Sequence, residues 1–325
     1  MTIDGHVLDA VCAAMRGTSR AALAVHESPD GDAVGAAAGM LDLFASLDIE
    51  AALYVDAGVT LPLAHEFLPA ASVVTGPPPG AATLYALDCG SAARLAVSLP
   101  EGRRVAVNID HHHDNTRFGE LNFVDGHASS TSELVCAIAE RLGLRFSPRA
   151  AAALYAGISF DTGHFQHDST SADTFTCCAR LVTDGADPNH VYRLLYETRS
   201  LASLRLWALA IERAQAAAGG RALLAQLRAD DFALTGASDD ETEGIVDALR
   251  SVPGVEVAAL VRPRGDGHVR VSLRSDGFDV SAVAGLRGGG GHRQAAGFTA
   301  DGTVEEVTQW LSTVLDERLS TASSS

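Results

Sequence analysis

Residues 21–47 read AALAVHESPDGDAVGAAAGMLDLFASL and join a short apolar run to a helical pattern through a polar loop. The run Ala21–Val25 is strand-like, and Asp32–Leu47 repeats apolar residues at the spacing of one helix face. The loop carries His26, Asp30 and Asp32. Ligands of open α/β sheets bind beyond the carboxyl ends of the strands, so this loop is a candidate site.

The same alternation continues along the chain to about residue 160. Ala51–Val55, Thr83–Leu87 and Arg104–Ile109 are strand-like, and Ser130–Leu142 is predicted to be a helix because Ser130 and Glu133 form a capping box. Strands that alternate with helices predict an α/β fold with a mostly parallel sheet and helices on both faces.

The second half of the chain has a different organisation. Residues 148–218 have helical patterns, and after Gly219 and Gly220 short strand-like runs follow, which predicts a smaller α+β unit. We therefore expect one domain at 1–195, a helical linker at 196–219, a second domain at 220–317 and a disordered tail at 318–325.

Composition excludes several classes of function. The chain of 325 residues has 24 basic residues, all arginine, against 41 acidic residues. Its net charge of −17 predicts that it binds duplex DNA poorly. Five cysteines without a CxxC pair indicate a reducing, cytoplasmic location, and no long apolar stretch predicts a membrane span. An anionic substrate would need metal ions or an arginine cluster to overcome the overall charge.

Aspartate and histidine side chains recur where the predicted strands end. Asp88 follows one strand, Asp110 and His111 follow another, and Asp161 follows an apolar helix. Taken singly, each has an ordinary interpretation as a turn residue or, for Asp32, a helix cap. Together, several carboxylates at one sheet edge would repel one another unless cations neutralise them. Carboxylate and imidazole without thiolate suit Mn²⁺, Mg²⁺, Fe²⁺ or Co²⁺.

These motifs resemble those of the DHH phosphoesterase superfamily in both order and spacing. The pattern His26-x-x-x-Asp30-x-Asp32 is followed by Asp88, by Asp110-His111-His112 and by Asp161-Thr-Gly. The later segment GGGGHRQAAG at 288–297 is similar to the glycine-rich signature of the DHH-associated substrate domain, which the segment around Arg274 also fits. Length and domain pairing resemble the nanoRNase and pAp phosphatase group, including its cyclic-dinucleotide phosphodiesterases.

The resemblance implies two divalent metal ions, with Mn²⁺ first and Mg²⁺ or Co²⁺ as alternatives. It assigns one ion to His26, Asp30 and Asp88, and the other to Asp32, Asp88, His111 and Asp161. Asp88 would bridge them, His112 would contact the phosphate, and Asp110 would orient an imidazole. The implied contacts to the rest of the substrate are Arg274, Gly289, Gly290, Gly291 and His292. We assign no role to Arg287, His164 or His167.

The expected activity is therefore hydrolysis of phosphoesters in small nucleotides and short single-stranded RNA. Expected substrates are short oligoribonucleotides, pApA, cyclic di-AMP and pAp, with 5′-mononucleotides as products. Two alternatives stay open: an inorganic pyrophosphatase of the same superfamily, and a non-catalytic nucleotide sensor on the same fold. We expect no membrane partner, and the sequence leaves the choice between a monomer and a homodimer open.

Overall fold

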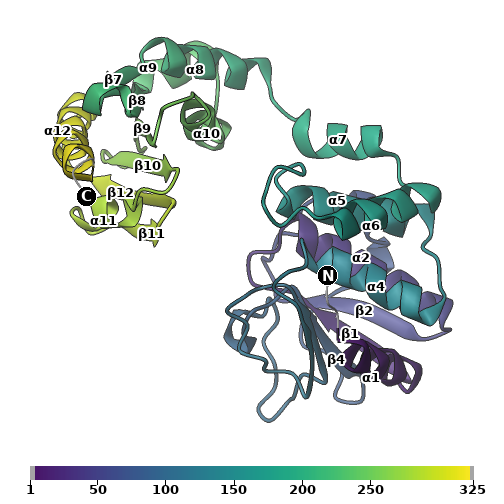
Figure 1. Ribbon diagram of the computed structural model, residues 1–325. Coiled ribbons are helices and arrows are strands. Elements are labelled where there is room, and N and C mark those ends of the chain that lie inside the picture. Colours follow the sequence, from purple (N-terminus) through teal and green to yellow (C-terminus); the bar gives the residue numbers. More distant parts are fainter. Residues whose placement is uncertain (1–3, 323–325) are drawn as a thin grey trace. The chain divides into compact units, whose positions relative to one another are not determined.

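The computed structural model describes residues 4–322, and the chain divides into two compact units, Met1–Thr198 and Arg199–Ser325 (Figure 1). The strands of the first unit are β1 Arg20–Ala24, β2 Glu50–Val55, β3 Val73–Thr75, β4 Thr83–Leu87, β5 Val107–Asp110 and β6 Leu121–Val124. Its helices are α1 Gly5–Arg16, α2 Gly31–Ser46, α3 Ala64–Phe67, α4 Thr131–Leu142, α5 Pro148–Asp161, α6 Ala172–Thr183 and α7 Pro188–Tyr196, with short 3₁₀ turns η1 Ala70–Ser72 and η2 Ala92–Arg94.

The first sheet is parallel throughout, as the alternating pattern predicted. Its strand order is β3-β2-β1-β4-β5-β6, and every neighbouring pair is parallel. The chain moves outward from β1 to β2 and β3, then returns to place β4 on the other side of β1. The strand order thus reverses between β1 and β4, which is where open α/β sheets bind their ligands.

The coverage of this sheet differs in one respect from the expectation. Helices α1, α2, α4 and α5 contribute to one large core with Leu23, Tyr85 and Ile109 of the sheet. The opposite face, with Ala22 and Leu84, is covered by Val97, Val105 and other residues of the connections between strands instead of by a helix. The β4–β5 connection has the prolines and glycines of a loop, so it supplies apolar side chains without a continuous helix.

The second unit is built around a mixed sheet of strand order β11-β12-β10-β9-β8-β7, in which only β8 and β9 run parallel. These strands are β7 Gln215–Ala217, β8 Ala222–Gln226, β9 Val257–Pro263, β10 Val269–Ser275, β11 Gly290–His292 and β12 Ala295–Ala300. The helices are α8 Leu201–Glu212, α9 Ala229–Thr235, α10 Ile245–Arg250, α11 Val280–Gly285 and α12 Val304–Ala322, with turns η3 Ala218–Gly220 and η4 Asp239–Thr242.

Two segments at the edges of this unit bear on the expected domain boundaries. Leu206 and Ala210 of α8, in the segment expected as a linker, are buried with Ala225 and Leu260 in the core of the second unit. Residues 318–322, expected in a disordered tail, continue α12, whose buried Leu311, Leu315 and Leu319 repeat every four residues. Residues 323–325 lie outside the described part of the chain.

No described helix combines the length and the apolar character that crossing a membrane requires.

Candidate metal centre

Imidazole and carboxylate side chains of the first unit converge at the carboxyl ends of its central strands. They form three groups whose ligand atoms lie within 4.8 Å of one another: His26, Asp30 and Asp88; Asp32, His111 and Asp161; and Asp88, His111 and His112. The structure thus brings together all six side chains that the sequence suggested as metal ligands. Asp88 belongs to two of the groups, which is the position that a bridging carboxylate requires.

The distances within these groups place Asp88 at the centre. Its Oδ2 lies 3.5 Å from Nε2 of His26, and its Oδ1 lies 3.7 Å from Nε2 of His111. His26 Nε2 is also 3.9 Å from Asp30 Oδ2, and His111 Nε2 is 2.9 Å from Asp161 Oδ2. Asp88 therefore connects the His26 side of the centre to the His111 side.

The fold explains why Asp88 holds this place. It directly follows β4, whose neighbours β1 and β5 are followed by His26 and His111 respectively. Its φ of +53° is left-handed, and its backbone N–H donates to the carbonyl of Ile109. Aspartate tolerates this conformation better than most residues, and such backbone positions concentrate at functional sites.

Asp32 is held by the first turn of α4 and does not cap α2. The cap of α2 is Asp30, whose Oδ1 accepts from the backbone N–H groups of Asp32 and Ala33 at 2.9 and 3.1 Å. The fully buried Asp32 carboxylate instead accepts from the backbone N–H groups of Thr131 at 2.6 Å and Ser132 at 2.9 Å. The unpaired N–H groups of a helix N-terminus favour a carboxylate at this point.

This contact depends on close approach of three helices. A Cβ at Gly157 of α5 would lie 2.8 Å from Asp32 Oδ1 and would overlap the side chain of Ser132. A Cβ at Gly35 of α2 would lie 2.6 Å from the carbonyl oxygen of Ala153. The small residues of α2 and α5 therefore allow the backbones to approach closely enough to seat Asp32 on α4.

Thr131 is a further partner of the centre, although the sequence indicated no more for it than a place at a helix cap. Its Oγ1 donates to Asp88 Oδ1 at 3.0 Å, and both residues are buried. Through its backbone and its side chain, Thr131 thus contacts two of the carboxylates of the centre. The capping box at Ser130 and Glu133 marked this helix start in the sequence, but a cap has local partners, whereas these partners lie 43 and 99 residues away.

The ionisable side chains of this centre shift one another's pKa values. Burial lowers the pKa of His26, but the carboxylates of Asp30 and Asp88 outweigh it and raise that pKa to about 9. Burial likewise opposes protonation of His111, while its bond to Asp161 and its proximity to Asp32 and Asp88 raise its pKa to about 10. Burial, with the negative charges of Asp88 and Asp161, raises the pKa of Asp32 well above its usual range. Without cations, protons must neutralise the cluster.

His112 is oriented by Asp110, the pairing that we expected between an imidazole and this carboxylate. His112 Nδ1 lies 2.7 Å from Asp110 Oδ1, and the other oxygen of Asp110 accepts from Asn115. Burial raises the pKa of Asp110, but the bonds from His112 and Asn115 outweigh it, and the net shift is downward. The ionised Asp110 in turn raises the pKa of His112. Nδ1 of His112 also lies 3.8 Å from Asp88 Oδ1, so the imidazole borders the centre.

The second unit holds the residues suggested for the rest of the substrate. Arg274 on β10 forms an ion pair with Asp247 of α10 at 3.2 Å, a partner that the sequence did not predict. Gly290, Gly291 and His292 form the exposed strand β11. These, together with Gly289, lie in one hairpin with β12.

Close packing explains why two positions of this hairpin are glycine. A Cβ at Gly289 would overlap Phe298, and one at Gly291 would lie 2.5 Å from the carbonyl oxygen of Ala295. Gly291 also has a φ of +139°. A Cβ at Gly290 would have no atom within 4 Å, so packing does not require glycine at this position.

The polar residues without an assigned role have structural partners. The guanidinium of Arg287 lies 4.3 Å from the ring centroid of Trp310. The ring of His164 stacks on Tyr196 with centroids 4.1 Å apart, and His167 Nδ1 lies 3.0 Å from the carbonyl oxygen of Asp161.

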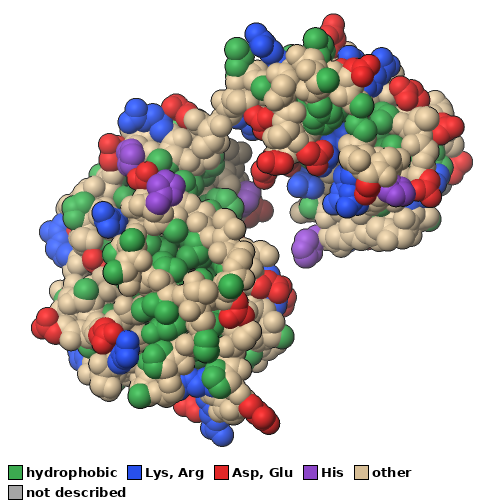
Figure 2. Space-filling view, turned by 180° about the vertical axis from the view of Figure 1, so that it is seen from behind, with side chains coloured by type: hydrophobic (Ala, Val, Ile, Leu, Met, Phe, Trp, Pro, Cys, Tyr) green, Lys and Arg blue, Asp and Glu red, His purple; other side chains and the backbone are tan. Residues whose placement is uncertain are grey.

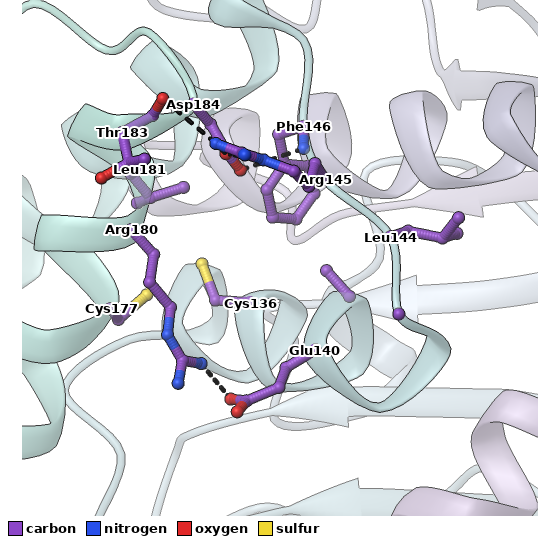
Figure 3. Close-up of a pocket in the computed structure, with 12 residues that line it drawn as sticks. Cys136, Glu140, Leu144, Arg145, Phe146, Cys177, Arg180, Leu181, Thr183 and Asp184 are labelled. Atoms are coloured by element: carbon purple, nitrogen blue, oxygen red, sulfur yellow. Dashed lines mark hydrogen bonds and ion pairs between the residues drawn. The ribbon is translucent and has the colours of Figure 1, made fainter.

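A separate cavity of about 370 Å³ lies between α4 and α6 (Figure 3). Cys136 and Cys177 point into it, and the ion pairs Arg180–Glu140 and Arg145–Asp184 border it. None of the residues suggested by the sequence lines it.

Comparison with known proteins agrees with this arrangement. The profile of the DHH family, N-terminal domain, matches residues 20–158, and that of the DHHA1 domain matches residues 219–321. A bifunctional oligoribonuclease and PAP phosphatase NrnA of Thermus thermophilus is 34% identical over 285 residues, which cover 86% of this chain and 84% of that protein. The chain belongs to the DHH family of phosphoesterases.

Other known proteins are similar to this chain to different extents. The probable NrnA of Streptococcus mutans is 31% identical over 84% of this chain and 86% of its own length. The cyclic-di-AMP phosphodiesterase GdpP of Geobacillus thermodenitrificans is 32% identical over 88% of this chain, but over only 45% of its own length. An exopolyphosphatase-related protein from Bacteroides fragilis has the same fold, with a TM-score of 0.80 at 23% identity over 97% of both chains.

The donor set fits divalent metal ions. Four carboxylates and three imidazoles, with no thiolate among them, are the ligands that Mn²⁺ and similar ions prefer. Two of the carboxylates, Asp32 and Asp88, are almost completely buried, and such groups are costly to leave ionised without a cation. The DHH family and the chemistry of these residues therefore agree on divalent metal.

Proposed function

We propose that this protein hydrolyses phosphoester bonds of small nucleotides with two divalent metal ions, preferably Mn²⁺. The substrates would be pAp, linear dinucleotides such as pApA, cyclic di-AMP and short oligoribonucleotides, and the products 5′-mononucleotides. The observation that carries the proposal is the position of Asp88, which shares its two oxygens between the His26 and the His111 groups. The similarity to proteins named NrnA and GdpP supports nucleotides as the substrate class.

In this proposal, His26, Asp30 and Asp88 hold one ion, and Asp32, Asp88, His111 and Asp161 hold the other. Ions bound there would lower the pKa of a coordinated water and polarise the reacting phosphoryl group. The protein's own contribution is to fix the donors: α4 orients Asp32 and Asp88 through Thr131, and the sheet edge supplies the remaining ligands. Rigid donors of this kind reduce the reorganisation that catalysis requires.

His112 would act on the phosphate itself. Asp110 holds its Nδ1 and stabilises the protonated imidazole, so that Nε2 can donate a hydrogen bond to a phosphoryl oxygen or a proton to the leaving oxygen. Asn115 keeps Asp110 in place by donating to its second oxygen. His112 would therefore stabilise charge on the phosphate, while other residues bind the metal ions.

The test is a turnover panel on the full chain with pAp, pApA, cyclic di-AMP and pyrophosphate, in Mn²⁺ and in excess EDTA. We expect hydrolysis of at least one nucleotide with Mn²⁺ and none with EDTA. Turnover of pyrophosphate alone would replace the proposal by the pyrophosphatase alternative. Nucleotide binding without turnover of any substrate would favour a sensor.

A further inference from the structure

Phe160 exposes an aromatic ring beside the metal centre. It is the last residue but one of α5, it directly precedes Asp161, and 46% of its surface is exposed. Burying a phenylalanine side chain stabilises a fold, and the half-exposed Phe160 forgoes part of that gain. The fold therefore gives no full account of an aromatic residue at this position.

The contacts of Phe160 define where its ring lies. A Cβ added to Gly31 would come 2.9 Å from both Cβ and Cγ of Phe160, so the side chain rests directly on Gly31. Gly31 lies between Asp30, which belongs to the group with His26 and Asp88, and Asp32, which belongs to the group with His111 and Asp161. Asp161, the next residue, belongs to the second of these groups. Phe160 thus borders the centre next to three of its carboxylates.

The ring of Phe160 is also free of aromatic partners among the described residues. Two other strongly exposed aromatic side chains of this unit, Phe175 and Tyr192, stack on neighbours. Phe175 stacks on Phe165 with centroids 5.5 Å apart, and Tyr192 stacks on His164 at 4.9 Å. Phe160 has no such neighbour, so a face of its ring is available to a ligand.

We infer that Phe160 stacks on the nucleobase of the nucleotide whose phosphate lies at the metal centre. This inference rests on the proposed function. Every base offers a π face, so an aromatic platform binds nucleotides with little sequence preference, while purines offer the larger surface. Phe160 would therefore select substrates that carry a base next to the scissile phosphate.

The experiment compares pAp with its abasic analogue, in which hydrogen replaces the adenine, as substrates of the full chain in Mn²⁺. Wild type should hydrolyse pAp with the lower KM. Phe160→Leu keeps an apolar side chain on Gly31 but removes the π face, so it should raise the KM for pAp about 5- to 150-fold. The KM for the abasic analogue should stay within about twofold, and Phe160→Trp should restore the KM for pAp.

A matched control is Phe175→Leu, which removes an exposed aromatic ring on α6, 55% exposed and outside the three metal groups. It should leave both KM values unchanged. Equal losses on pAp and on the abasic analogue in Phe160→Leu would overturn the inference, because they would indicate a role in the metal centre or the fold. Failure of the wild type to hydrolyse any nucleotide would instead overturn the proposed function, which is a distinct result.

Discussion

Replacing Thr131 by valine should weaken metal binding without unfolding the protein. Valine keeps the size and the β-branched shape of threonine but cannot donate to Asp88 Oδ1. The backbone N–H of residue 131 still donates to Asp32, so only one bond to the centre is removed.

The size of the effect follows from the environment of that bond. The bond measures 3.0 Å, the acceptor is a carboxylate, and the two residues are 0% and 2% exposed, so water cannot replace the donor. A hydrogen bond to a charged group contributes about 1.5–3 kcal/mol, which corresponds to about a 10- to 150-fold change in affinity. Loss of a residue that orients a metal ligand costs about 10- to 100-fold, in agreement with that range.

The assay is titration of the metal-free protein with Mn²⁺ by calorimetry, for wild type, Thr131→Val and Thr131→Ser. Serine retains the hydroxyl and should bind Mn²⁺ within a few-fold of wild type. Thermal unfolding of the metal-free proteins serves as the control for stability. Wild-type affinity in Thr131→Val, or an equal loss in both variants, would refute the reasoning, because the hydroxyl would then not be the cause.

Three further predictions concern the centre and the second unit. Asp88→Ala should reduce turnover by several orders of magnitude while circular dichroism shows an intact fold; activity retained in that variant would exclude a bridging role. Mn²⁺ affinity should rise from pH 6.5 to about 10, because His26 and His111, with pKa values raised to about 9 and 10, must lose protons to bind a cation, and a flat profile of affinity would contradict the assignment. The metal-free protein should become less stable as pH rises through the same range, because folding raises both pKa values. Arg274→Ala should raise the KM for pApA about tenfold and leave the KM for bis-p-nitrophenyl phosphate unchanged. Equal effects on both substrates would contradict a contact between Arg274 and a second phosphate.

Sequence reasoning recovered the parts of the fold that have local signals. The strand Thr83–Leu87 has the predicted bounds, and α4 starts at its predicted cap, Ser130. The short strands β3 and β6 were not predicted, because three or four residues at a sheet edge have too few positions to establish a period. The other face of the first sheet is covered by loops, and composition does not specify how a loop packs.

The candidate ligands were predictable for a different reason. His26, Asp88 and His111 each follow a strand, and a parallel sheet brings such positions to one edge whatever the length of the connections. Thr131 and Asn115 were interpreted as residues of a helix cap and a turn, because their contacts with the centre depend on the exact approach of α4 and of a loop. The ion pair between Arg274 and Asp247 could not be predicted either, because it depends on how β10 packs against α10.

The contact of α4 with Asp32 also makes the helix start a reporter for hydrogen exchange. Amides in the first turn of a helix ordinarily lack a partner and exchange quickly with solvent. Here the amides of Thr131 and Ser132 are buried and bonded to a carboxylate of the metal centre. Their exchange rates should therefore follow the order of the centre itself, and a single pair of amide signals would monitor its assembly in solution without any substrate.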